Sequence, residues 1–290
     1  MRAGQPSRTA DQNALFRAME ARRPAAVRIA DDPLAVRFLS PEFRVLAGAA
    51  RLAPARRLLE TVIDHRWPCA RPGVVARTRL IDQLILQELG KVGQVLILGA
   101  GFDTRALRLP GMDRVRVFEL DHPATQAAKQ RALRDGRQSS AHVTLVPVVL
   151  GADDPGHALT ASGFTAGEPA LVLWEGVTNY LDRDAVDATF GLLASMLGSG
   201  SLVLFTYVDA GILDGSADFA GAQTTMRAVR RAGEPFTFGF VPSELPGYLA
   251  ARGFELLSDE RVSDAARRFY PEGKCPAAPA YYHVAESRKR

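Results

Sequence analysis

The amino-acid sequence predicts an α/β fold in which a doubly wound, mostly parallel sheet is covered by helices on both faces. The apolar run Val95–Leu98 lies between Gly93 and Gly99, as expected of a strand buried on both faces. Apolar strands and helical segments then alternate along the middle of the chain, which is the order that specifies a parallel sheet. Carboxylates directly follow two of these strands, at Asp121 and Glu175. Ligands of such sheets bind at the carboxyl ends of the strands.

The loop after the first strand has the composition of a nucleoside-binding turn. Gly99 and Gly101 let the backbone turn sharply and let a ligand approach without a Cβ in the way. Asp103 or Thr104 can cap the helix that follows. The second strand, residues 115–120, ends on Asp121, 20 residues beyond Gly101. At that separation a βαβ unit brings an acid to the hydroxyls of a ribose.

The same loop distinguishes between nucleoside cofactors. A dinucleotide site has a third glycine where this chain has Thr104, and Asp103 would repel a pyrophosphate. A cofactor with a ribose and no phosphate fits better, and S-adenosylmethionine (SAM) is the common one. These residues weigh against a nicotinamide-dependent oxidoreductase. For a Gly-x-Gly taken alone, the alternative is a tight turn that binds nothing.

Three helices are expected in the first 75 residues, over residues 11–30, 33–39 and 43–65. The Asp31-Asp32-Pro33 sequence ends the first of them. We expect residues 1–75 to form an N-terminal helical lid and residues 76–290 to form the cofactor-binding core. The alternative is that these helices only pack against the back of the sheet.

The helix that leads into the first strand is expected to begin after a break at Pro72-Gly73 and to end at Gly90. Its apolar positions between 80 and 89 follow a 3.6-residue period. Arg77 and Arg79, near its start, are candidates to hold a cofactor carboxylate through a bidentate guanidinium. In a chain this rich in arginine, a surface charge is the alternative for either.

Three further elements are expected to bring a second carboxylate to the site. A helix should run from Pro123 to Gly136, and a third strand should cover 143–150, at an edge because Pro147 cannot donate a ladder hydrogen bond. The fourth strand, 170–174, ends on Glu175. A carboxylate after an apolar strand costs free energy unless it is satisfied, which favours a functional role.

The last third of the chain is expected to complete the sheet. Asp182 should cap a helix that reaches Leu197, and a fifth strand should cover 202–207. A helical region over 209–233 precedes an aromatic alternation at 235–240, which indicates either a strand or a pocket wall. Two closing strands, near 254 and over 280–285, would form an antiparallel edge.

Composition excludes several classes of protein. The net charge of +4 and pI of about 9.3 come from scattered arginines rather than a cluster, which favours a solvated surface over a nucleic-acid interface. Cys69 and Cys275 lie far apart, so neither a structural metal site nor a disulfide framework is expected. Because no apolar run approaches the length of a membrane span, we expect a soluble cytoplasmic protein without a membrane partner.

Longer motifs spread along the chain carry a family resemblance. The sequence resembles the leucine carboxyl methyltransferase family of class I SAM-dependent enzymes, and within it the bacterial branch with polyketide carboxyl O-methyltransferases. The resemblance implies a Rossmann-like fold, and transfer of the methyl group of SAM to a small-molecule carboxylate, leaving S-adenosylhomocysteine (SAH). The matching segments are residues 7–10, 31–35, 76–82, 98–105 (Leu-Gly-Ala-Gly-Phe-Asp-Thr-Arg), 119–123, 174–181 (Trp-Glu-Gly-Val-Thr-Asn-Tyr-Leu) and 233–239.

The resemblance also implies roles for individual residues. Arg77 matches the arginine that binds the methionine carboxylate, and Glu175 matches the glutamate close to the methionine amino group. Asp121 matches the acid on the ribose. Gly99, Gly101 and the adjoining Asp103 match the loop under the cofactor.

One position departs from the family pattern. Where relatives carry an acid that receives the adenine amino group, followed by an apolar residue, this chain has Val149 followed by Leu150. We assign Leu150 to the cofactor site on that basis. Either Asp153 or Asp154 substitutes for the missing acid, or the cofactor site is impaired.

The acceptor side is predicted from aromatic residues. Tyr180, beside the Glu-Gly motif, and Tyr207, at the end of the fifth strand, are the candidate catalytic residues, and Phe236, Phe238 and Phe240 are further pocket candidates. A carboxylate acceptor is ionised at pH 7 and needs no general base, whereas a phenol does. His65, His122 and His283 remain possible bases. The alternatives are a phenol, a protein C-terminal carboxylate, or a non-enzymatic SAM-binding protein with a decayed site.

Overall fold

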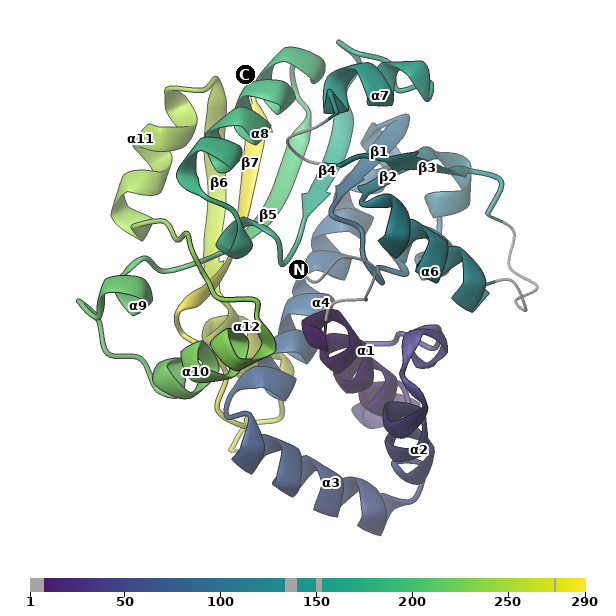
Figure 1. Ribbon diagram of the computed structural model, residues 1–290, viewed down its shortest axis with the longest axis vertical. Coiled ribbons are helices and arrows are strands. Elements are labelled where there is room, and N and C mark those ends of the chain that lie inside the picture. Colours follow the sequence, from purple (N-terminus) through teal and green to yellow (C-terminus); the bar gives the residue numbers. More distant parts are fainter. Residues whose placement is uncertain (1–7, 134–139, 150–152, 274) are drawn as a thin grey trace.

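A seven-stranded sheet runs through the computed structural model, which describes residues 8–133, 140–149, 153–273 and 275–290 (Figure 1). The strand order is β3-β2-β1-β4-β5-β7-β6, and β1 to β5 are parallel, whereas β7 runs antiparallel to both of its neighbours. The predicted doubly wound sheet with an antiparallel edge is therefore confirmed. The strands are β1 Gln94–Leu98, β2 Arg116–Asp121, β3 Val143–Pro147, β4 Ala170–Trp174, β5 Leu202–Val208, β6 Phe254–Arg261 and β7 Tyr282–Lys289.

Helices pack on both faces of the sheet because its central strands are apolar on both faces. Every residue of β1, β4 and β5 is buried. One face packs against α4 (Ala70–Glu88) and α12 (Val262–Phe269). The other packs against α7 (Pro155–Ala161), α8 (Arg183–Met196) and α11 (Leu245–Ala250). Side chains of the central strands β1, β4 and β5 alternate between these two cores, so each of them contributes to both.

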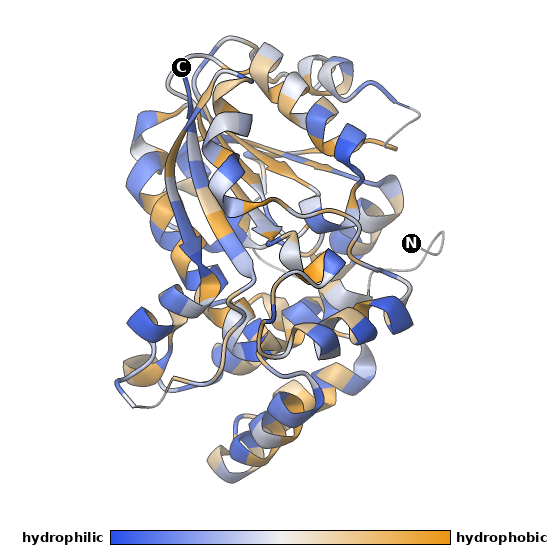
Figure 2. Cartoon of the chain, turned by 90° about the vertical axis from the view of Figure 1, so that its left-hand side faces the viewer, coloured by the Kyte–Doolittle hydropathy of each residue, from blue (hydrophilic) through white to orange (hydrophobic). Residues whose placement is uncertain are grey.

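Three α-helices precede α4 in the described part of the chain and lie in the lower half of the molecule as drawn (Figures 1 and 2). They are α1 Arg8–Glu20, α2 Pro41–Ala49 and α3 Ala53–Arg66. Their buried side chains form a smaller apolar core with α4. The predicted helix over 11–30 is wrong beyond Glu20, because Pro24 disfavours helical geometry in the residue before it. The predicted helix over 43–65 is two helices, with an extended Leu52 between them and Pro54 in the first turn of α3.

The start of α4 corrects another prediction. Pro72 and Gly73 lie in the first turn of this helix rather than in a break before it. A backbone N–H in the first turn has no carbonyl of the helix to donate to, so proline, which lacks the N–H, is tolerated there. The Gly73 amide donates to the Cys69 carbonyl at 3.1 Å. Residue 75 therefore lies within α4, and the division into a lid and a core stays a prediction.

The remaining elements follow the expected order with changed bounds. Helix α6 covers Pro123–Leu133, while Gly136 and Leu150, both assigned by prediction, lie outside the described residues. The strand β3 forms an edge of the sheet, as Pro147 predicts. The short helices α5 (Arg105–Arg108) and α9 (Gly211–Asp214) and the longer α10 (Ala222–Ala232) complete the chain. In the described part of the chain, no helix has both the length and the apolar character needed to cross a membrane.

Candidate functional site

The glycine loop after β1 has the tight backbone that the sequence predicts. Gly99 and Gly101 have φ angles of +62° and +45°, which L side chains rarely adopt. A Cβ on Gly99 would also lie 2.5 Å from Cγ2 of Val177. Gly99 is thus required by both conformation and packing, whereas a Cβ on Gly101 would meet no atom closer than 3.8 Å.

Asp121 lies at the end of β2, directly beside this loop. Its Oδ2 accepts a hydrogen bond from the Gly101 amide at 2.5 Å, and its Oδ1 accepts one from the His122 amide at 2.6 Å. Burial raises the pKa of the carboxyl, and the two amide donors act in the opposite direction. The 20-residue spacing seen in the sequence therefore corresponds to a direct contact between the acid and the second glycine.

Glu175, at the end of β4, lies between two arginines. Its Oε1 accepts from Arg77 Nε at 2.6 Å, and its Oε2 accepts from Arg105 Nη1 at 2.6 Å. Burial by itself would raise the pKa of the Glu175 carboxyl, but the charges of Arg105 and Arg77 outweigh it and lower the pKa to about 2. The carboxylate is therefore ionised at any physiological pH.

Arg77 faces the same site from α4. Its guanidinium lies over the ring of Tyr282, 4.9 Å from the ring centroid, which fixes its orientation. Only its Nε is used in the ion pair with Glu175, so other N–H groups of the fork can reach a ligand. Arg79, two residues along the helix, is exposed and does not line the cavity.

Arg105 is the central cation of a buried charge network that we did not predict. Its Nη1 contacts Asp103 as well as Glu175, and its Nε donates to Asp82 Oδ1 at 2.7 Å. Burial alone would raise the pKa of the Asp103 carboxyl, yet Arg105 holds it below its ordinary value. Asp82 is the last residue of the matching segment 76–82, and Arg105 is the last residue of the matching segment 98–105. Their place in these two segments was the only feature of the sequence that indicated a role for them.

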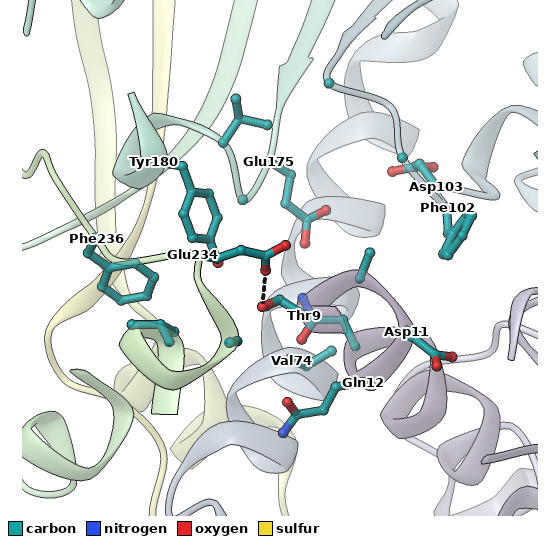
Figure 3. Close-up of a pocket in the computed structure, with 18 of the residues that line it drawn as sticks. Thr9, Asp11, Gln12, Val74, Phe102, Asp103, Glu175, Tyr180, Glu234 and Phe236 are labelled. Atoms are coloured by element: carbon teal, nitrogen blue, oxygen red, sulfur yellow. Dashed lines mark hydrogen bonds between the residues drawn. The ribbon is translucent and has the colours of Figure 1, made fainter. Parts of the chain in front are cut away.

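One cavity joins these residues to an apolar region beyond them. Its volume is about 1360 Å³. The cofactor candidates Arg77, Gly99, Gly101, Asp103, Asp121 and Glu175 all line it. Tyr180 lines the farther part, where its ring meets Phe236 edge-on with centroids 5.5 Å apart (Figure 3). Burial raises the pKa of the Tyr180 hydroxyl, so this side chain is neutral at pH 7.

The comparison with known proteins identifies the family. A model of the family described as leucine carboxyl methyltransferase matches residues 10–194. The chain belongs to the leucine carboxyl methyltransferase family. The matched segment runs from before Arg77 to beyond Glu175, so it contains every residue predicted for the cofactor site.

Two relatives of this family member carry a provisional name as S-adenosyl-L-methionine-dependent methyltransferases. The protein from Mycolicibacterium gilvum is 37% identical over 210 residues, which cover 68% of this chain and 66% of the relative. The protein from Streptomyces coelicolor is 32% identical over 246 residues, which cover 83% of this chain and 80% of the relative. The chain thus spans about two thirds or more of the length of each.

Solved structures support the fold of this family member. A provisionally named methyltransferase from Thermobifida fusca has a TM-score of 0.58 at 16% identity, covering 100% of this chain and 97% of its own. A DUF574 family protein from Streptomyces avermitilis has a TM-score of 0.59 at 16% identity, covering 98% and 100%. At this level of identity the likeness concerns the fold alone.

Tyr207 corrects the predicted acceptor site. It is fully buried and does not line the cavity, and its hydroxyl donates to Asp259 Oδ2 at 2.6 Å. The ring stacks on His283, with centroids 4.7 Å apart. Phe238 and Phe240 are likewise core residues, on the same face of the sheet. The structure therefore brings only Tyr180 and Phe236 of these aromatic candidates to the cavity.

The two acids that follow Val149 make different contacts in the structure. Val149 lines the cavity, and its amide donates to Asp153 Oδ2 at 2.7 Å. Asp154 instead caps α7, where its Oδ1 accepts from the amides of Gly156 and His157. Of the two acids that could replace the missing one, Asp153 is therefore the one that lies beside Val149, while Asp154 has a structural role.

Proposed function

We propose that this family member is a SAM-dependent O-methyltransferase that acts on a small-molecule carboxylate, foremost that of a polyketide-like aromatic acid. The observation that carries the proposal is the single cavity in which the glycine loop, Asp121 and the Arg77–Glu175 pair meet an apolar region lined by Tyr180. The family supplies the class of reaction, and the cavity supplies space for a second molecule beside the cofactor.

The residues present fit the cofactor. The absence of a Cβ at Gly99 and Gly101 leaves the backbone open to a nucleoside, and Asp121 can bind the ribose hydroxyls. Arg77 would hold the methionine carboxylate, and the ionised Glu175 would hold the ammonium group. When bound, SAM supplies an electrophilic methyl group and leaves as SAH.

The protein's own part in catalysis is positioning and exclusion of water. Methyl transfer breaks one carbon–sulfur bond and forms one carbon–oxygen bond in line, so orientation contributes most of the rate. A carboxylate acceptor carries no proton at pH 7 and leaves no proton to remove. The residues described around the cavity include no lysine and one histidine, His122, which adjoins Asp121 on the ribose side. This lining supports a carboxylate acceptor.

A phenol is the second candidate for the acceptor. The presence of Glu234 in the lining of the cavity favours it. This glutamate lines the cavity near Tyr180 and could serve as a general base (Figure 3). A base would have to remove the phenolic proton before or during transfer. The product separates the two candidates, because a methyl ester is hydrolysed in mild alkali and an aryl methyl ether is not.

Calorimetric titration with SAH tests the cofactor assignment first. We expect micromolar binding by the wild type, and a loss of about 10-fold or more for Asp121→Ala, since a hydrogen bond to a charged group contributes about 1.5–3 kcal/mol. Asp113→Ala is the matched control, because this acid is exposed and lies outside the cavity. Equal binding by both variants would refute the ribose role of Asp121.

The acceptor class is then tested with methyl-labelled SAM. Aromatic acids, phenols and peptides with a free C-terminal carboxylate are assayed in parallel, and the label is followed into alkali-labile or alkali-stable product. Transfer into alkali-labile product from small acids supports the proposal. If the wild type does not bind SAH at all, the decayed-site alternative, for which Val149 is the sequence hint, replaces it.

A further inference from the structure

Helices α2 and α3 bury little of their surface against the rest of the molecule. Ile63 is the one buried residue among the 14 of α3, and Ala47 is the one buried residue among the nine of α2. In Figures 1 and 2, α3 forms the lower end of the molecule. Most of the surface of these two helices therefore faces solvent and is open to a partner.

This surface carries a concentration of apolar side chains. Nine large apolar side chains are exposed in the described part of the chain, and four of them lie between residues 45 and 62. They are Val45 on α2, Leu52 at the corner between the helices, and Leu58 and Val62 on α3, with exposed fractions of 56–72%. Single exposed apolar residues need no explanation, but a group of them indicates an interaction surface.

The exposed apolar residues of α3 belong to one side of the helix. Five exposed residues of α3, which we call the exposed stripe, recur at intervals of three and four residues: Pro54, Leu58, Thr61, Val62 and His65. Arg57 lies four residues before Thr61, and Arg66 lies four residues after Val62. At 3.6 residues per turn, these two arginines flank opposite edges of the stripe.

The charges around the exposed stripe are mainly positive. Arg44, Arg51, Arg57 and Arg66 are all exposed, and none of them forms an ion pair with a carboxylate in the described residues. Burial and the charge of Arg51 lower the pKa of the Arg22 guanidinium, so two like charges lie near each other at this end of the molecule. The cations of this surface are therefore available to an anionic partner.

The acids of the same two helices do not balance these cations. Glu60 pairs with Arg23 at 2.5 Å, and Asp64 pairs with Arg71 at 2.6 Å. Glu42, at the start of α2, is exposed and is the one acid of these helices without an ion pair in the described residues. The surface of α2 and α3 thus combines apolar side chains with an excess of positive charge.

The spacing of the arginines disfavours a second copy of this chain as the partner. A two-fold interface brings the same patch of both copies together. With antiparallel helices, Arg57 of one copy would lie opposite Arg66 of the other, because both are equally far from the middle of the stripe, between Thr61 and Val62. With parallel helices, each arginine would face its own equivalent. Either arrangement brings like charges together, which destabilises an interface.

An anionic lipid bilayer complements both features of this surface. A helix that lies on a bilayer places its apolar side chains at the boundary between headgroups and acyl chains, and its arginines contact anionic headgroups. We propose that α2 and α3 dock on an anionic lipid surface through the exposed stripe and its flanking arginines. The expectation of no membrane partner was based on a spanning segment, which a helix lying on a bilayer does not need.

The proposed docking surface adjoins the cavity. Phe43 of α2, together with Arg66 and Trp67 at the end of α3, lines it. The Arg66 guanidinium lies 5.6 Å from the centroid of the Trp67 ring, and tryptophan is enriched where proteins meet the membrane interface. Docking would therefore bring this part of the lining close to the lipid, from which an apolar acceptor can enter.

Vesicle sedimentation with the whole protein tests the inference. The protein is mixed with vesicles of phosphatidylcholine alone, or of phosphatidylcholine and phosphatidylglycerol in equal parts, and the bound fraction is measured after centrifugation. At low salt we expect about tenfold or more tighter binding to the anionic vesicles. Binding should weaken as the salt concentration rises, because salt screens the attraction between exposed charges.

Two double variants assign the binding to the surface. Arg51→Gln combined with Arg57→Gln should weaken binding by about 30-fold, since each arginine near an anionic surface contributes about fivefold. Leu58→Ser combined with Val62→Ser should weaken it by about tenfold through the lost apolar contact. Both double variants should bind SAH with the affinity of the wild type, which shows that they are folded.

Matched controls come from other elements of the chain. Arg114 is exposed in the segment before β2, and Leu257 is 39% exposed on β6. Arg114→Gln and Leu257→Ser remove a charge and an apolar side chain outside the proposed surface. Neither should change the binding of anionic vesicles.

The possible results separate this inference from the proposed function. No binding to anionic vesicles, equal binding to both kinds of vesicle, or binding that neither double variant weakens would overturn the inference. Dimerisation in analytical ultracentrifugation that is lost in Leu58→Ser with Val62→Ser would assign the stripe to a second copy instead. Because SAH binding is measured separately, each of these results leaves the methyltransferase assignment intact.

Discussion

Replacing Glu175 by glutamine perturbs the charge balance at the centre of the cavity. Glutamine has nearly the same shape, so the change removes a charge without removing volume. Among the described residues, Glu175 is the only carboxylate that pairs with Arg77, whereas Arg105 keeps Asp82 and Asp103. The variant therefore leaves one buried guanidinium without an anionic partner.

The size of the effect follows from the pKa of the carboxyl. It falls from an ordinary value of 4.5 to about 2, for a side chain that is 12% exposed. At about 1.4 kcal/mol per pH unit, this difference corresponds to about 3 kcal/mol of stability at pH 7. The magnitude agrees with the roughly 3–5 kcal/mol that breaking a buried ion pair costs.

The pH dependence has a defined direction. Because the folded-state pKa lies below the unfolded value, the stabilisation is present above pH 4.5 and is lost as the pH falls toward 2. At pH 3.5 about 2 kcal/mol of it should remain. The difference in stability between wild type and Glu175→Gln should therefore shrink on acidification.

Urea unfolding followed by tryptophan fluorescence at pH 7 and pH 3.5 measures this difference. Glu168→Gln is the control, because Glu168 is 54% exposed and its pair with Arg116 should contribute less than about 1 kcal/mol. A loss below about 1 kcal/mol in Glu175→Gln at pH 7, or the same loss at both pH values, would refute the assigned charge network.

Three further substitutions test other parts of the site. Gly99→Ala should destabilise the protein by about 1–3 kcal/mol and weaken SAH binding, because of the positive φ and the clash with Val177; chemical unfolding and calorimetry report both, and an unchanged protein would contradict the packing argument. Tyr207→Phe should cost about 1–3 kcal/mol through the lost bond to Asp259 yet leave methyl transfer unchanged in a labelled-SAM assay, and a large loss of kcat in a folded variant would restore a catalytic role. Val149→Asp should tighten SAH binding by about 0.5–1.5 kcal/mol in calorimetry because position 149 lines the cavity, and weaker or equal binding would show that an acid at this position does not reach the adenine.

The sequence by itself determined the strands of the sheet, the edge position of β3 and a helix cap beside the sheet. The strand over 170–174 has its predicted bounds because a parallel strand buried on both faces must be a continuous apolar run. Pro147 placed β3 at the edge because proline cannot donate to a neighbouring strand. Asp182 caps α8 as predicted, since its side chain accepts from the Ala185 amide. These features depend on local chemistry, which the order of residues contains.

Only the tertiary structure decided which side chains share the cavity. Tyr207 was expected there, but strand alternation turns it, with Phe205, toward α8 and α11, and a strand that is apolar on both faces does not reveal which face a residue takes. Asp103 was expected to cap the next helix and to lie under the cofactor, yet Arg105 joins it with Glu175 and Asp82 in a charge network assembled from α4, α5 and the end of β4. Thr9 and Glu234 lie 225 residues apart in the chain and meet at the lining of the cavity. Such contacts depend on how distant elements pack, and no local pattern in the sequence encodes them.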